Sequence, residues 1–198
     1  MSTLFALSRA IEARDPHSSG HSARMAVMAE VVAERLGWDE ADVEILRLGA
    51  ALHDVGKRAI PERILRKPGP LDDDELEAMR RHPEEGARMV ARHPELHLVV
   101  PAVLYHHERW DGSGYPMGIE GEGIPAEARV LAVVDAFDAM TTDRSYRRAL
   151  PHSHALAELE RCAGTQFDPE IVRVFVEAWK DGSFADATAP RQLERVAG

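Results

Sequence analysis

The chain has only one cysteine, Cys162, among its 198 residues, so it cannot form an internal disulfide. This scarcity is typical of a reducing compartment. No apolar run approaches the ~20 residues that a membrane-spanning helix needs. The first 14 residues carry Arg9, Glu12 and Arg14, which argues against a signal peptide. Together these absences predict a cytoplasmic protein without a membrane span.

Positive charge is also scarce. The chain has 24 lysines and arginines against 34 aspartates and glutamates, which gives a net charge of -10. A protein that binds duplex nucleic acid needs a basic face for the phosphates, so the composition argues against that class. An anionic substrate would depend on local cations in a cleft, such as metal ions and a few arginines.

The patterns that are present are those of helices. With 44% hydrophobic and 29% charged residues, the chain has the balance of one globular domain. Apolar side chains recur at helical spacing, and no segment alternates with a period of two. We therefore predict an all-α domain of about eight or nine helices over residues 1–182, followed by a tail at 183–198. The clearest helices are an amphipathic one that ends at Asp15-Pro16 and those at 21–36, 83–92, 97–108, 126–142, 153–162 and 169–179.

Short polar motifs mark several helix boundaries. Asp39 is placed to cap a helix that ends at His53-Asp54, and Gly37 ends the helix before it. Asp72 and Glu75 have the spacing of a capping box. The segment 109–125 holds five glycines and two prolines, and we predict a long functional loop there.

Three short segments carry metal-binding chemistry. His106 and His107 directly precede a glycine-rich loop that ends in Gly114-Tyr115-Pro116, with His53-Asp54 upstream and Asp135 downstream. Imidazole and carboxylate suit iron, manganese, nickel or zinc. A lone His-Asp pair at a helix end is often only a cap, and a His-His pair is often half exposed. In combination, these segments predict metal-assisted hydrolysis.

The segments 53–57 and 106–116 resemble the HD-GYP branch of the HD-domain metal-dependent phosphohydrolases, and the similarity runs from about residue 10 to 176. It implies a phosphodiesterase that uses a hydroxide bridging two metal ions to hydrolyse cyclic di-GMP to pGpG, and on to GMP in some members. Iron or manganese is the expected metal, with zinc or nickel as alternatives. The implied ligands are His21, His53, Asp54 and Asp135 around one ion, and Asp54, His82, His106 and His107 around the other.

His17 departs from this family pattern. It lies four residues before His21, where members with three metals typically carry glutamate. A shared helical face would direct both histidines to the cluster, whereas the flanking Pro16 and Gly20 favour an exposed loop. We expect two ions, leave a third ion at His17 open, and expect pGpG as the main product.

Substrate contacts are expected from cations and a ring near the cluster. Lys57 is placed to stabilise charge on phosphate beside Asp54, or it is a surface lysine. Arg144 and Arg147 match basic family positions that contact the dinucleotide, and arginine pairs bidentately with phosphate. The alternative is that they form a solvated basic patch. Tyr115 would stack on guanine or pin the loop to the core.

Two other functions stay open at this point. The domain can be a regulatory module that binds a cyclic dinucleotide or a partner with negligible turnover, or a phosphohydrolase for another cyclic dinucleotide or nucleotide. The family loop is also associated with diguanylate cyclase partners. The N-terminal apolar stripe is expected to pack either on the domain itself or on a second copy, which would form a homodimer.

Overall fold

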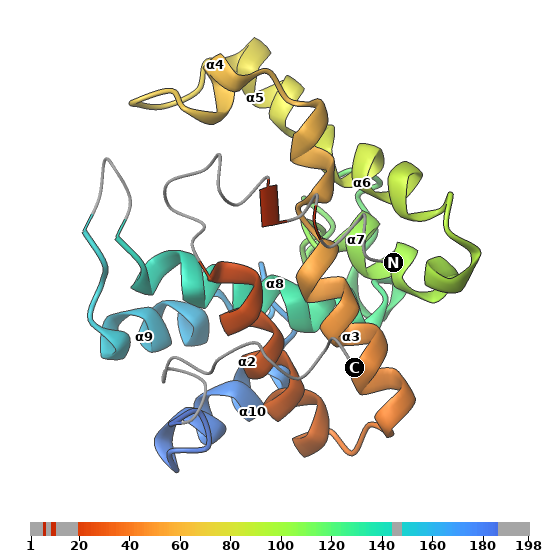
Figure 1. Cartoon of the computed structure of the whole chain (residues 1–198). Helices are drawn as coiled ribbons and strands as arrows, with labels where there is room; N and C mark the ends of the chain where they lie inside the picture. The colour runs from red at the N-terminus through yellow and green to blue at the C-terminus, as the bar shows by residue number, and fades with distance from the viewer. Residues whose placement is uncertain (1–5, 7–8, 11–19, 144–147, 186–198) are drawn as a thin grey trace.

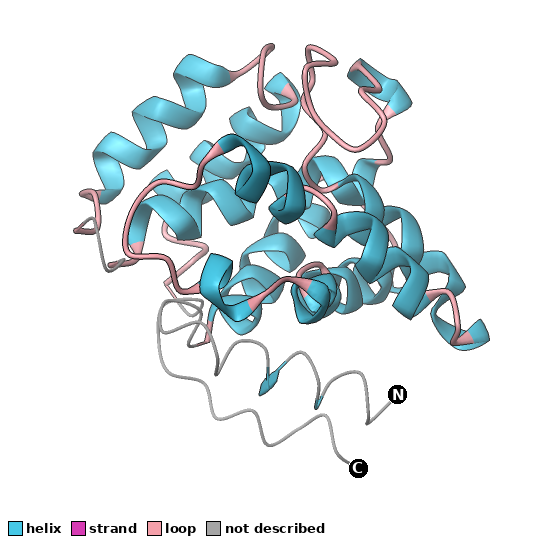
Figure 2. Cartoon of the chain, turned by 90° about the horizontal axis from the view of Figure 1, so that it is seen from above, coloured by secondary structure: helices cyan, strands magenta, loops and turns pink. Residues whose placement is uncertain are grey.

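The computed structural model describes residues 6, 9–10, 20–143 and 148–185. Within these ranges the chain forms helices and loops with no strand, which confirms the all-α prediction (Figures 1 and 2). The α-helices are α2 (His21–Arg35), α3 (Glu40–Leu52), α4 (Glu62–Leu65), α5 (Asp73–Met79), α6 (His82–Val90), α7 (Val100–Tyr105), α8 (Ala126–Thr141), α9 (His152–Cys162) and α10 (Pro169–Lys180). Short 3-10 helices lie at η1 (Val55–Ala59), η2 (Pro94–Val99) and η3 (Gly121–Gly123).

The predicted helix boundaries follow from local hydrogen bonds. The Asp39 side chain accepts from the Asp42 amide at 3.0 Å at the start of α3. Asp72 and Glu75 form the expected capping box of α5, each accepting from the other's backbone N–H. Gly37 adopts a φ of 77°, a left-handed conformation that ends α2 at little cost because glycine has no side chain.

Two hydrophobic clusters position the site. The larger one joins α2, α3, α8, α9 and α10 around buried side chains such as Met25, Leu131 and Phe175, with α8 crossing the centre of the bundle (Figure 1). The smaller cluster includes Leu52 and Val55, which flank His53 and Asp54, so this segment is anchored on both sides. None of the described helices is both long and apolar enough to cross a membrane.

The prediction of a single helix at 97–108 is wrong. The chain forms η2 and then α7, which ends at Tyr105. Pro101 lies in the first turn of α7, where its missing N–H breaks the hydrogen-bond pattern that one continuous helix would need. His106 and His107 therefore follow the helix end. The elements η1, α4 and η3 were not expected either.

The two ends of the chain are only partly described. The predicted N-terminal amphipathic helix and residues 186–198 fall largely outside the described residues. Phe184 is buried against Phe175 and Trp179, with ring centroids 4.9 and 5.7 Å away, so the core reaches two residues past 182. The division into a domain and a tail at 182 stays a prediction.

Candidate metal centre

The carboxylate of Asp54 lies between two groups of histidines. Its Oδ2 is 3.3 Å from Nε2 of His53, and its Oδ1 is 3.4 Å from Nε2 of His82. Asp54 lies between α3 and η1, whereas His82 begins α6, so separate elements meet at this side chain. A carboxylate can serve two cations because its two oxygens have separate lone pairs. Asp54 is thus placed to join two metal positions.

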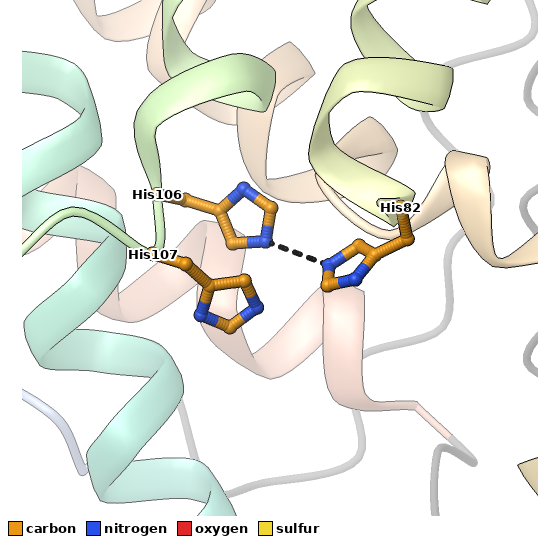
Figure 3. Close-up of side chains that lie close together, drawn as sticks. All are labelled: His82, His106 and His107. Atoms are coloured by element: carbon orange, nitrogen blue, oxygen red, sulfur yellow. Dashed lines mark hydrogen bonds between the residues drawn. The ribbon is translucent and has the colours of Figure 1, made fainter. Parts of the chain in front are cut away.

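The other implied ligands collect on the two sides of Asp54. On one side, Nε2 of His21 is 3.4 Å from both Nε2 of His53 and Oδ1 of Asp135. On the other side, the ligand atoms of His82, His106 and His107 lie within 4.8 Å of one another (Figure 3). The side with His21 corresponds to the ligand set predicted for one ion, and the side with His82 corresponds to the set predicted for the other ion. Each side holds a group of three residues whose ligand atoms are close enough together to hold a metal ion.

Backbone carbonyls fix the tautomers of three of these histidines. Nδ1 of His53, His82 and His106 each lies 2.8 Å from a carbonyl oxygen three residues earlier in the chain. A carbonyl can only accept, so each Nδ1 carries a proton. The neutral rings of His82 and His106 then direct two Nε2 lone pairs at each other across 3.3 Å (Figure 3). Two lone pairs repel at this distance, whereas a cation that both nitrogens ligate would stabilise them.

Burial keeps most of the histidine cluster neutral. Desolvation is the largest influence on His82 and lowers its pKa to about 3, despite the opposing effect of the Asp54 carboxylate. Burial and neighbouring imidazoles also hold the pKa values of His106 and His107 well below their usual range. A neutral imidazole is the form that binds a metal.

His53 and Asp54 behave as a charged pair. Burial lowers the pKa of His53, but the carboxylates of Asp54 and Asp135 outweigh burial and raise it to about 9. Burial raises the pKa of Asp54, yet Lys57 and His53 hold it well below its usual range. In the metal-free protein at neutral pH, His53 is therefore protonated and Asp54 is ionised.

Metal uptake should release a proton from His53. At pH 7 the ring is charged because its pKa is about 9, and it must lose that proton to act as a ligand. We expect close to one proton released per chain at pH 7, and apparent affinity on the His53 side that rises about tenfold per pH unit up to that pKa. An indicator dye in weak buffer during metal titration measures the release. Uptake without proton release at pH 7 would contradict the charged His53.

Asp138 is a site residue that the sequence interpretation missed. Its Oδ2 lies 2.7 Å from Nδ1 of His21, in the place that a backbone carbonyl takes for the other three histidines. Arg24 donates to the same carboxylate from Nε at 2.5 Å and from Nη2 at 2.9 Å. Burial raises the pKa of Asp138, but the hydrogen bonds from His21 and Arg24 lower it overall. Asp138 follows Asp135 by three residues on α8, a helical spacing that places both on one face.

Asp138→Asn should weaken metal binding mainly on the His21 side. The amide keeps the shape of the side chain but removes the charge that orients and polarises His21. Loss of such a supporting carboxylate typically costs about tenfold to a hundredfold in metal affinity. Metal titration of the purified variant measures the effect. Asp168→Asn is the matched control, because Asp168 is also buried and accepts from an arginine, Arg129, at 2.5 Å. Equal metal loss in both variants would contradict a specific role for Asp138.

The glycine-rich loop is pinned at several points. The buried carboxylate of Glu108 accepts from the amides of Met117 at 2.6 Å and Gly118 at 3.1 Å, an anchor that the sequence interpretation missed. The Trp110 amide donates to the carbonyl of Gln166 at 3.1 Å. Tyr115 stacks on His107 with ring centroids 4.9 Å apart. The loop thus holds an aromatic ring directly over His107, one of the predicted metal ligands.

A cavity of about 550 Å³ opens beside the two groups of ligands. Its lining includes His21, Asp54, His82, His107 and Asp135. The candidate substrate residues Lys57 and Tyr115 line it as well, and Lys57 Nζ donates to Oδ2 of Asp54 at 2.6 Å. The structure therefore places these two side chains beside the predicted ligands.

Three candidate residues lie outside the described residues. They are His17, Arg144 and Arg147. Their roles as a third-metal ligand and as substrate contacts stay predictions.

Residues 6–171 match a family model described as the HD domain. This chain belongs to the HD-domain family. The chain is 47% identical over 172 residues to the "cyclic di-GMP phosphodiesterase response regulator RpfG" of Xanthomonas campestris. The aligned region covers 86% of this chain and 46% of the relative. The chain is 35% identical over 189 residues to the "3′3′-cGAMP-specific phosphodiesterase 2" of Vibrio cholerae, covering 94% of this chain and 36% of the relative. These matches confirm the HD-GYP identification.

The fold is similar to that of a Vibrio cholerae cyclic GMP-AMP specific phosphodiesterase, V-cGAP3. The TM-score is 0.73 at 20% identity, over 95% of this chain and 50% of that chain. This chain spans less than half the length of the two curated relatives. The similarity therefore concerns only part of each of these longer proteins.

Proposed function

We propose that this HD domain is a metal-dependent phosphodiesterase that hydrolyses a cyclic dinucleotide, with cyclic di-GMP as substrate and pGpG as main product. The observation that carries the proposal is the position of Asp54, whose Oδ2 lies 3.3 Å from Nε2 of His53 and whose Oδ1 lies 3.4 Å from Nε2 of His82. Curated relatives at 35–47% identity that are named as phosphodiesterases for cyclic di-GMP and 3′3′-cGAMP support the substrate class.

The donor set fits two divalent ions. His21, His53, Asp54 and Asp135 would hold one, and Asp54, His82, His106 and His107 would hold the other. Facing Nε2 lone pairs and a shared carboxylate are the features that support this assignment. Mixed imidazole and carboxylate ligands favour iron or manganese, with zinc or nickel as alternatives. When bound, such a pair supplies Lewis-acid activation of phosphate and of water.

The side chains around the ligands orient and protect the substrate. Lys57 holds its ammonium group 2.6 Å from Asp54, where it can also donate to a phosphate oxygen. Burial is the largest cause of the raised pKa of Tyr115, so its phenol stays protonated and can donate a hydrogen bond. The Tyr115 ring stacks on His107, with ring centroids 4.9 Å apart, and so helps to hold that ring in place. Arg144 and Arg147 remain the proposed clamp on the phosphate.

A panel assay tests the substrate. Metal-replete protein, prepared without oxygen, is incubated with cyclic di-GMP, 3′3′-cGAMP and cyclic di-AMP, and products are separated over time. The proposal expects fastest loss of cyclic di-GMP, accumulation of pGpG and slow GMP formation. Faster turnover of 3′3′-cGAMP would overturn the choice of substrate. Tight binding of cyclic di-GMP without product would support the regulatory module instead of the enzyme.

A further inference from the structure

One wall of the cavity is formed by a segment that contains none of the predicted metal ligands. We call residues 62–79 the arm; it consists of α4, α5 and the loop between them, and it lies at the top of Figure 1, apart from α8. The arm contributes these cavity-lining residues: Ile64, Leu65, Lys67, Pro70, Leu71 and Met79. The same cavity is lined by Asp135 and Asp138 of α8. The arm and the metal-binding residues therefore face one shared space.

Lys67 brings a positive charge to this wall. Among the described residues that line the cavity, the cationic side chains other than histidine are Lys57, which lies beside Asp54, and Lys67. Two other cations of the arm, Arg63 and Arg66, are not among the lining residues, and their side chains are 74% and 52% exposed. Lys67 is thus the arm's cationic contribution to a cavity in a protein of net charge -10.

The carboxylate that holds the Lys67 ammonium group, that of Glu75, also has other partners. Lys67 donates to Glu75, and Asp72 lies 3.5 Å away. Glu75 also accepts from the Asp72 amide at 3.1 Å and lies 3.7 Å from Arg63. The hydrogen bond to Glu75 is the main cause of the raised pKa of Lys67, which keeps it charged at neutral pH. If Lys67 turned toward an anion, Glu75 would keep its other two partners.

The cationic and apolar side chains of the arm suit the half of a cyclic dinucleotide that does not lie at the predicted metal ligands. Such a substrate has two phosphodiesters and two purines, and only one phosphodiester can lie at the Asp54 cluster. Resting on the function proposed above, we propose that the arm binds the uncleaved half, with Lys67 on the second phosphate and the apolar side chains of Leu65 and Leu71 against a purine. Lys67 is thereby a substrate-binding residue that favours cyclic dinucleotides over simple diesters.

Two substrates and two variants test this assignment. Cyclic di-GMP has a second phosphate, whereas bis(p-nitrophenyl) phosphate has one phosphate and no purine. Lys67→Met should raise KM for cyclic di-GMP about tenfold with less than a twofold change in kcat, because a charged hydrogen bond to bound substrate is lost. Its kinetics on bis(p-nitrophenyl) phosphate and its metal content should equal those of wild type. Lys67→Arg should keep KM close to the wild-type value.

Arg63→Met is the matched control. The substitution also removes a cationic partner of Glu75, but Arg63 does not line the cavity. Its KM for cyclic di-GMP should be unchanged. An unchanged KM in Lys67→Met, an equal rise in Arg63→Met, or an equal loss on both substrates would each overturn the Lys67 assignment. A wild-type protein that cleaves bis(p-nitrophenyl) phosphate but no cyclic dinucleotide would instead overturn the proposed function.

Discussion

Asp54→Asn should abolish hydrolysis of cyclic di-GMP and remove both metal ions. The two Asp54 oxygens face His53 on one side and His82 on the other, so its charge is shared by both metal positions. The amide has nearly the same shape but carries no charge and has only one acceptor oxygen. We expect activity to fall on the order of a thousandfold or more, because the electrostatic stabilisation that the metals supply is lost.

Metal content and turnover measured on the same sample check this expectation. Asp135→Asn is the matched control, since Asp135 lies 3.4 Å from His21 and belongs to one side of the site. It should deplete one ion per chain, whereas Asp54→Asn should deplete both. Near-wild-type metal content in Asp54→Asn would contradict the shared carboxylate.

Gly56→Ala should unfold the centre of the site. An added Cβ at Gly56 would lie 1.9 Å from the carbonyl oxygen of His82 and 2.5 Å from the amide nitrogen of Gly86, both of which are backbone atoms that cannot rotate away. The segment after His53-Asp54 would have to separate from the start of α6, which carries His82. We expect a loss on the order of 3 kcal/mol in the free energy of unfolding, together with loss of metal.

Chemical denaturation of the metal-free variant measures the stability change. Gly123→Ala is the control, because a Cβ there meets no atom within 4 Å and Gly123 does not have a positive φ. It should change stability by less than about 0.5 kcal/mol. Equal stability of the two variants would show that η1 and α6 are not packed as closely as described.

Local patterns were enough to predict most of the helical fold. The Asp39 cap, the Asp72 capping box and the Gly37 stop each depend on residues within a few positions, so sequence spacing determines them. The single helix predicted at 97–108 does not form, because Pro101 has no N–H and starts a new helix within an otherwise helical pattern. The short helix α4 has only four residues, which is too few for periodicity to detect.

The candidate site was predictable only in part, because its residues are brought together by tertiary packing and not by local sequence spacing. The candidate metal ligands came from the family resemblance, because residues such as His21 and Asp135 are far apart in the sequence and meet only through the packing of α2 against α8. The supporting contacts were not predictable. Asp138 receives hydrogen bonds from Arg24 and His21 across more than a hundred residues. Nothing in the local sequence distinguishes such a carboxylate from a surface aspartate.

The most direct test of the account is turnover measured against the number of ions bound per chain. Protein stripped with a chelator is reloaded in steps with manganese or ferrous iron without oxygen, and pGpG formation from cyclic di-GMP is followed at each step. If two metal ions carry the reaction, metal-free protein should give no product, and activity should be full once two ions are bound per chain. Product from the metal-free protein, or none from protein that holds two ions, would contradict it.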